Sequence, residues 1–317
     1  MKETTLTFAG ADDATIFVYR WRPQTTPAAV VHVVHGLAEH AGRYRRLATS
    51  LTAAGYAVYA SDLRGHGKTA NDEHELGLFA EHDGWRKCLD DLWQLTQHIA
   101  AENPGVPVLL LGHSMGATLA RQMMTEHGSA FAGVVLSGAN GQPTPLAQAG
   151  RLIARLEKLR IGPRGKSALI RALTFDAFNK PLHPVRTRFD WLSRDAKEVN
   201  KYVTDPLCGF DASVQLWIDL LDAWPRIAKS CAGIPRELPI YVISGSRDPV
   251  SAGTKMLRTM LAQYRAADLK VQHKFYPQAR HELFNETNRE EVIADLLSWI
   301  ESVVRGRENH NSVGESG

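Results

Sequence analysis

Apolar segments of strand length recur along the chain between turn residues. Those such as "AAVVHVV" and "LPIYVISG" are short, apolar throughout and rich in β-branched residues, which is typical of strands buried on both faces of a parallel sheet. The first two segments precede any helical pattern and predict an antiparallel edge. The predicted strands are 4–8, 14–21, 28–34, 56–60, 107–111, 132–137, 239–244 and 270–276.

Helical patterns lie between the later strands, and this alternation predicts an α/β fold with a mostly parallel sheet. The predicted helices are 42–54, 83–101, 115–127, 253–265 and 288–304.

The segment 138–235 breaks this alternation because it contains amphipathic helical stretches and no strand–helix–strand unit. We interpret it as a helical cap, inserted after the sixth strand and folded over one edge of the sheet. The predicted core is therefore split into 1–137 and 236–304, and the polar end of the chain, 305–317, is predicted to be disordered.

Composition narrows the class of protein. The 317 residues are 44% hydrophobic and 22% charged, with a formal net charge of +3. Such a chain can build a large core and shows no basic run that would indicate a nucleic-acid partner. The three cysteines are too scattered for a disulfide framework or a zinc site. Without an apolar leader or a membrane-length apolar run, we expect a cytoplasmic protein; nothing in the sequence indicates its oligomeric state.

Ser114 stands in "GHSMG", between a buried strand and a helical pattern. The pattern G-x-S-x-G in this setting is typical of the turn that projects a nucleophilic serine from the carboxyl edge of a sheet. Side chains at Gly112 or Gly116 would collide with the neighbouring strand and helix. We therefore favour a nucleophile over a tight turn that merely contains serine.

A serine nucleophile needs a base and an acid that orients the base. Asp248 follows one predicted strand in "VISGSRDPVS", and His281 follows the next in "FYPQARHELFNE". Both positions lie at the carboxyl edge, in the chain order Ser, Asp, His. Asp205, in "VTDPLC", is the main rival acid, but it lies within the insertion.

An oxyanion intermediate needs amide donors. We expect these to be the amides of Met115 and Leu37, the latter because Gly36 permits the backbone to turn inward. The same loop holds His35, Glu39 and His40, whose spacing does not match a metal motif, so we interpret them as loop scaffolding. "RGHGKT" is not a phosphate-binding loop, because Asp62 occupies the required first glycine position. No cofactor or metal is expected.

Taken in order, "HGLAEHAGRY", "SDLRGHGKT", "GHSMGA", "SGSRDPV" and "RHELFNE" resemble the landmarks of one branch of the α/β-hydrolases. This branch comprises monoacylglycerol lipases, bacterial lysophospholipase-like proteins and S33-type serine aminopeptidases. The resemblance implies Ser114, Asp248 and His281 as a catalytic triad, an oxyanion hole at Leu37 and Met115, and a cap that forms an acyl-chain tunnel.

The leading hypothesis is a serine hydrolase that cleaves carboxylic esters of monoacyl lipids. An amide or peptide hydrolase is the alternative, with Glu157, Asp190, Asp195, Asp211, Asp219 and Asp222 as possible anchors for a substrate amine. A third possibility is a non-catalytic protein that only binds acyl ligands. The presence of all three triad residues and of both glycines around Ser114 argues against it.

The cap segment "PLAQAGRLIARLEKLR" allows two interpretations. Its apolar stripe, Ala149, Leu152, Ile153, Leu156 and Leu159, can pack on the sheet domain and leave the basic side chains in water. Alternatively, the basic face of Arg151, Arg155 and Lys158 meets anionic lipid surfaces. We favour the first.

Overall fold

A computed structural model describes residues 1–143, 145–182 and 184–314, with side chains for all of these except 145, 146 and 308–314. Its centre is a sheet with the strand order β1-β2-β4-β3-β5-β6-β7-β8. The strands are β1 (Lys2–Ala9), β2 (Thr15–Arg22), β3 (Ala29–Val34), β4 (Tyr56–Ser61), β5 (Val108–His113), β6 (Gly133–Ser137), β7 (Ile240–Gly245) and β8 (Val271–Tyr276).

Strand β2 pairs antiparallel with both β1 and β4, and all the other neighbouring pairs are parallel. The predicted antiparallel edge and mostly parallel eight-stranded sheet are therefore confirmed. The residues of the five strands β3 to β7 are all buried, which explains why their sequences are mostly apolar.

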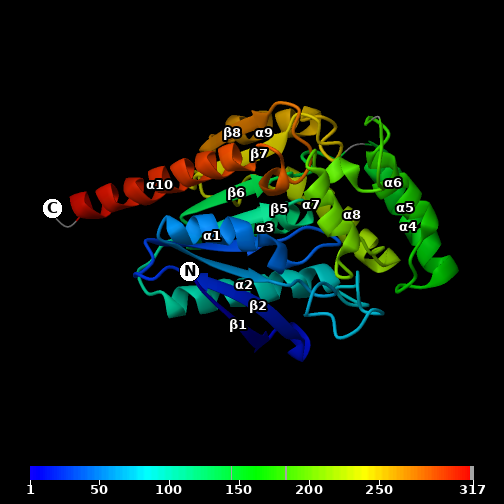
Figure 1. The fold of residues 1–317 in the computed structure, drawn as a ribbon, viewed down its shortest axis with the longest axis horizontal. Coiled ribbons are helices and arrows are strands. Elements are labelled where there is room, and N and C mark those ends of the chain that lie inside the picture. Colours follow the sequence, from blue (N-terminus) through cyan, green and yellow to red (C-terminus); the bar gives the residue numbers. More distant parts are fainter. Residues whose placement is uncertain (144, 183, 315–317) are drawn as a thin grey trace.

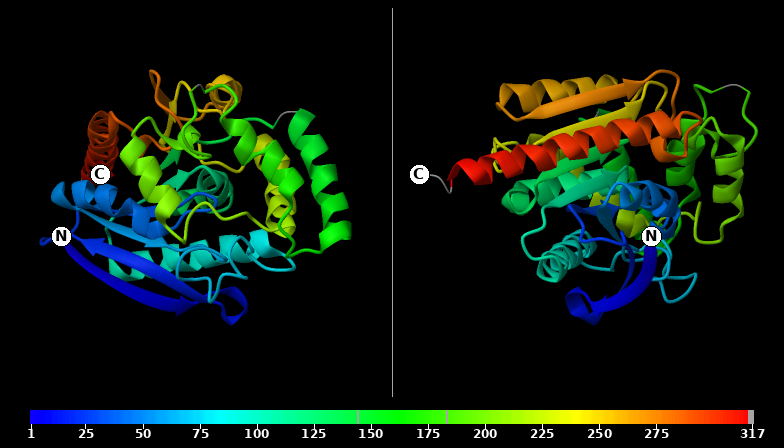
Figure 2. Two further views of the ribbon diagram at one scale, coloured as in Figure 1. Left: turned by 45° about the vertical axis from the view of Figure 1, so that its right-hand side comes forward. Right: turned by 60° about the vertical axis from the view of Figure 1, so that its left-hand side comes forward.

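Helices cover both faces of the sheet (Figures 1 and 2). On one face, α1 (Arg45–Ala53) and α10 (Arg289–Gly314) bury side chains such as Leu47 and Leu296 against the sheet. On the other, α2 (Gly84–Glu102), α3 (Met115–His127) and α9 (Lys255–Ala266) contribute a second apolar layer. Each layer buries the apolar stripe of its helices, and this burial stabilises the fold.

The helical segment predicted after the sixth strand is present between β6 and β7, and its helices α4, α5 and α6 lie together at the right of Figure 1. Helix α4 packs along α8. The elements are α4 (Pro145–Ile161), α5 (Ala168–Leu173), α6 (Phe175–Phe178), the 3-10 turn η4 (Asp190–Leu192), α7 (Ala196–Thr204) and α8 (Val214–Lys229). We call this segment the cap; its predicted boundaries at 138 and 235 stay predictions.

Helix α4 leaves exposed the leucines that the sequence indicated as its packing stripe. Leu152, Leu156 and Leu159 are 62%, 57% and 85% exposed. Arg151 and Arg155 instead form ion pairs with Asp222 of α8. The expectation that this leucine stripe packs on the sheet domain is therefore wrong, because α4 packs within the cap through Ala154 and Ile153, against residues of α5 and α8.

Helix α10 runs on beyond residue 305, and the predicted disorder of residues 305–317 stays a prediction. Helix α10 continues to Gly314, and Arg305 pairs with Glu301 one turn earlier. Extending a helix that has already begun adds a hydrogen bond for each residue fixed, so a polar sequence can continue it. Residues 315–317 lie outside the described residues.

Candidate active site

Ser114 occupies the turn between β5 and α3, with φ 54° and ψ −117°. A non-glycine residue at positive φ is strained and persists only where the surroundings enforce it. A β-carbon on Gly112 would overlap the carbonyl oxygen of Gly116, and one on Gly116 would overlap that of Val34. Both glycines are therefore required by close backbone approach, as the sequence indicated.

Asp248 and His281 meet at the carboxyl edge of the sheet, in the loops that follow β7 and β8. His281 Nδ1 lies 2.9 Å from Asp248 Oδ2, and the two side chains are 2% and 0% exposed. The amide of Val250 donates to the other carboxylate oxygen over 2.9 Å, which fixes the carboxylate in place. With Nδ1–H donating to Asp248, His281 keeps Nε2 as an acceptor.

Electrostatics favour a proton on His281. Burial alone lowers the pKa of His281, but the neighbouring Asp248 carboxylate opposes this effect, and the pKa is raised above its usual 6.5. A histidine with a raised pKa is a stronger base, provided that the pH keeps it neutral before reaction.

Asp205 lies elsewhere. It pairs with His40 Nε2 over 3.0 Å and accepts a bond from the Leu207 amide. His281 already has Asp248 as its carboxylate partner. The geometry therefore favours Asp248 over its rival as the orienting acid.

Ser114 and His281 border one cavity of about 440 Å³, which we call the central cavity. Leu37 and Met115 lie on its wall beside Ser114. The cap supplies most of its apolar lining, including Ile153, Ile170, Phe175, Phe178, Trp191, Trp217, Leu221 and Trp224. The polar groups thus gather at the sheet edge, opposite an aromatic and aliphatic wall that suits an apolar substrate group.

The loop after β3 turns inward at Ala38 and not at Gly36, where the sequence indicated the turn. Gly36 is needed for space, since a β-carbon there would lie 3.1 Å from that of Ser114. The left-handed backbone is at Ala38, with φ 57°. The carbonyl of Ala38 accepts bonds from Tyr202 Oη over 2.7 Å and from the Gly209 amide over 2.9 Å. The cap thus fixes the bend beside Leu37, which no local sequence signal revealed.

The polar residues of this loop act as scaffolding, as predicted. The two ring nitrogens of His35 bond the Gly36 carbonyl over 2.7 Å and the Leu63 amide over 2.9 Å. Glu39 accepts a bond from the Gly36 amide over 2.7 Å. These bonds account for the histidine and the carboxylate without a metal ion.

One feature of this region was missed by the sequence interpretation. Among the described residues, His40, Asp205 and Cys208 bring their potential metal-ligating atoms within 4.8 Å of one another. His40 and Asp205 already pair, however, and burial raises the pKa of the Cys208 thiol, which disfavours the thiolate that a metal requires. We interpret the cluster as a link between the loop and the cap.

The segment that mimics a phosphate-binding loop follows β4 and has a structural role. Asp62 accepts bonds from the amides of Ala41 and Lys68, over 2.7 and 2.8 Å. It therefore ties its own loop to the loop after β3.

A mostly parallel sheet with a strained serine turn after its fifth strand and helices inserted after its sixth defines the α/β-hydrolase fold. The family model described as "Serine aminopeptidase, S33" (Hydrolase_4) matches residues 25–288. The chain therefore belongs to the Hydrolase_4 family of α/β-hydrolases.

Individual relatives extend over nearly the whole chain. The monoacylglycerol lipase of Mycolicibacterium smegmatis is 31% identical over 304 residues, covering 93% of this chain and 96% of that protein. The monoglyceride lipase of Homo sapiens is 31% identical over 288 residues, covering 88% and 87%. The structure of a carboxyl esterase from Bacillus coagulans superposes with a TM-score of 0.88 at 25% identity, covering 96% of this chain and 99% of that one.

No helix among the described residues is long and apolar enough to cross a bilayer.

Proposed function

We propose that this protein is a serine hydrolase that cleaves carboxylic esters of monoacyl lipids, of the monoacylglycerol or lysophospholipid type. The observation that carries the proposal is the buried Asp248–His281 pair, whose histidine borders, together with Ser114, a cavity with an otherwise apolar wall. The names of the relatives, two monoacylglycerol lipases and a carboxyl esterase, support the same class of substrate.

In this mechanism, Ser114 Oγ attacks the ester carbonyl while His281 Nε2 takes its proton. Asp248 holds the imidazole in the required tautomer and stabilises the imidazolium. The amides of Leu37 and Met115 donate to the oxyanion, and His281 then protonates the leaving alcohol. Water, activated by the same histidine, releases the fatty acid from Ser114. The apolar wall of the cap binds the acyl chain.

The contacts of the six candidate amine anchors argue against peptide hydrolysis. None of these residues, all of them described, belongs to the lining of the central cavity. Five of them form ion pairs with arginine, and Asp219 accepts a hydrogen bond from Gln215. The carboxylates that do border the cavity, Glu39 and Glu282, both pair with Arg43. An ester substrate needs no such anchor.

We further propose that the exposed leucines of α4 make peripheral contact with lipid surfaces. Leu169 and Leu173 of α5 are also about half exposed, and Leu173 borders the central cavity. Exposed leucines on the outside of the cap, one of which borders the cavity, suit a substrate that partitions from a lipid phase. The contact is made by leucines rather than by the basic face, whose arginines pair with Asp222.

A fluorophosphonate probe tests the proposed chemistry. We expect covalent labelling that peptide mapping locates at Ser114. A panel of monoacylglycerols, lysophospholipids, p-nitrophenyl esters and aminoacyl anilides then defines the substrate. A chain that binds acyl ligands without being labelled would instead be a non-catalytic binder, and preferred turnover of the anilides would establish the peptidase alternative.

A further inference from the structure

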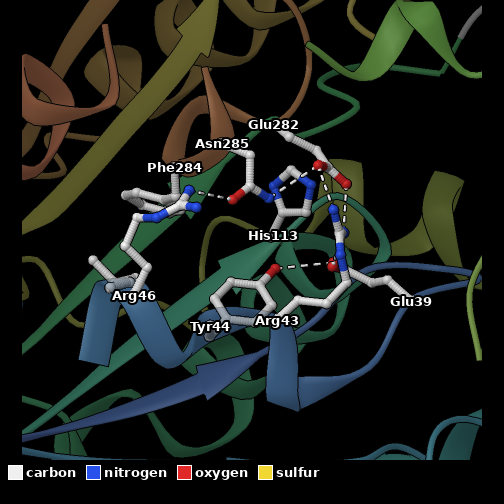
Figure 3. Close-up of a pocket in the computed structure, with 9 residues that line it drawn as sticks. Glu39, Arg43, Tyr44, Arg46, His113, Glu282, Phe284 and Asn285 are labelled. Carbon is white, nitrogen blue, oxygen red and sulfur yellow. Dashed lines mark hydrogen bonds and ion pairs between the residues drawn. The ribbon is translucent and has the colours of Figure 1, made fainter. Parts of the chain in front are cut away.

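Arg43 bridges two carboxylates beside the candidate active site (Figure 3). It lies on the 3-10 turn η2 (Ala41–Tyr44). Its Nη1 donates to Glu39 Oε2 and Glu282 Oε1, both over 2.6 Å, and its Nη2 donates to Glu282 Oε2 over 2.7 Å. The three side chains are only 11%, 4% and 7% exposed. Such a buried, two-pronged contact is geometrically specific.

Each end of this bridge is attached to a loop of the proposed active site. Glu39 Oε1 accepts bonds from the Gly36 amide over 2.7 Å and from Tyr44 Oη over 2.9 Å, so it fixes the residue directly before Leu37. Glu282 follows His281 in the chain, and its amide donates to the Leu192 carbonyl over 2.7 Å. One guanidinium therefore joins the loop of a proposed oxyanion donor to the loop of the proposed base.

The charged and titratable groups around His281 influence its pKa. Asp248 faces the ring from the loop after β7, and the His113 ring lies 4.8 Å away, centroid to centroid. Burial lowers the pKa of His113 to about 4, so this neighbour is neutral near pH 7. Trp191 packs on the ring from η4 without adding charge.

The bridge itself contributes two acidic groups and one basic group. Glu282 and Glu39 act on the pKa of His281 in the same direction as Asp248 does. Arg43 neutralises only one of the two negative charges when both carboxylates are ionised. An excess negative charge therefore remains beside the imidazole.

We propose that Arg43 and Glu282 are positioning residues for ester hydrolysis. The bridge sets the separation between the Leu37 amide and the His281 imidazole, and the uncompensated carboxylate charge supports the imidazolium that forms when His281 takes the Ser114 proton. This inference rests on the proposed function. Catalysis depends on holding such groups within a fraction of an ångström, so a rigid link between two distant loops has a direct use.

Glu282→Gln tests the electrostatic part, because it keeps the shape and removes one negative charge. The proposed base works when neutral, so kcat/KM rises with pH through the pKa of His281. Without the Glu282 charge the imidazolium is less stable, and the midpoint of this acid limb should move to lower pH by about half a unit or more. The measurement is the pH profile of kcat/KM on a soluble short-chain ester.

Glu286→Gln is the matched control. Glu286 is fully buried on the same loop, but it binds Arg194 over 2.9 Å and the Arg280 amide over 2.7 Å. Its variant should lower the melting temperature and leave the midpoint in place. An equal shift of the midpoint in both variants, or none in Glu282→Gln, would overturn the electrostatic part.

Arg43→Lys tests the geometric part, because lysine keeps the charge and loses the fork. We expect kcat to fall about tenfold with KM and the acid limb little changed, since the donors lose alignment while the charge stays. A wild-type kcat in a folded Arg43→Lys protein would overturn it. If Arg43→Lys does not fold, the kcat of Glu282→Gln, measured at the optimal pH of that variant, tests the geometric part instead. This kcat should also fall, because an amide cannot accept the two-pronged contact from Arg43.

Fluorophosphonate labelling separates this inference from the function on which it rests. If wild-type Ser114 is not labelled, the proposed function fails. If wild-type protein is labelled, and Glu282→Gln and Arg43→Lys are labelled at the same rate with the same pH dependence, only the positioning roles fail.

Discussion

The carboxyl edge of the sheet and the cap face each other across the central cavity, but they hold their side chains by different means. At the sheet edge, Ser114, Asp248 and His281 each follow directly or closely on a parallel strand, and the Asp248–His281 pair is almost fully buried. The cap contributes separate helices, of which α4 is joined to α8 through ion pairs at exposed arginines. The proposed reacting groups thus lie at the sheet edge, and the residues proposed to meet an acyl chain lie on the cap.

This difference implies a division of roles. Substitutions at the sheet edge should abolish turnover whatever the substrate, because they remove interactions made only in the transition state. Substitutions in the cap should redistribute activity among substrates, because they alter the proposed binding site of the acyl chain and the route by which a substrate enters it.

Ser114→Ala is expected to have the largest effect. It removes the attacking oxygen and should lower kcat by about 10⁶-fold. This is the size of the loss when one member of a cooperating serine-hydrolase triad is removed. Circular dichroism should show an unchanged fold, since alanine fits the same turn. Substantial remaining hydrolysis in protein free of contaminating esterase would refute the nucleophile assignment.

Asp248→Asn comes next, with a loss on the order of 10⁴-fold in kcat, because asparagine presents the wrong hydrogen-bonding group to His281 Nδ1. Asp205→Asn is the control: it keeps a polar partner for His40 and should retain activity within a few-fold. Steady-state kinetics of both variants decide the matter, and the reverse pattern would make Asp205 the orienting acid.

Trp217→Ala tests the cap wall. The change enlarges the central cavity, so the ratio of kcat/KM values for bulky and short acyl esters should shift about tenfold toward the bulky ones. Trp93→Ala is the control, since Trp93 lies on helix α2 and its ring stacks on the His127 ring at a centroid distance of 3.8 Å. The same shift in both variants would mean that general loosening, and not cavity shape, sets the preference.

The smallest expected effect concerns the outside of the cap. Changing Leu152, Leu156 and Leu159 to Gln should cause a several-fold loss on substrate in lipid vesicles and leave a soluble short-chain ester unaffected. Changing Arg151, Arg155 and Lys158 to Gln should instead mainly lower the melting temperature, since two of them pair with Asp222 and the third donates to Gln215. A vesicle-specific loss in the basic triple variant alone would restore the basic-face hypothesis.

Much of the candidate site was accessible to sequence reasoning because its signals are local. A buried strand, a glycine-flanked serine and a helix are adjacent in the chain, and parallel strands necessarily end at the same edge. The positions of Ser114, Asp248 and His281 follow from these facts. The lining by Trp191 and Trp217 was not predictable in the same way, because the cap has no repeating strand–helix pattern to position its helices.

The sequence by itself determined the eight-stranded sheet, the helices that cover it and the order of the acid and base along the chain, since each depends on periodicity or on neighbours within a few residues. Only the tertiary structure decided which face of α4 points outward and which groups surround His281. Periodicity shows that a helix has an apolar stripe but not what lies opposite it, and Asp222 proved to be the partner of the basic side. Likewise, Arg43 and Glu282 are 239 residues apart in the chain, and no local pattern encodes a contact that exists only once two loops are packed together.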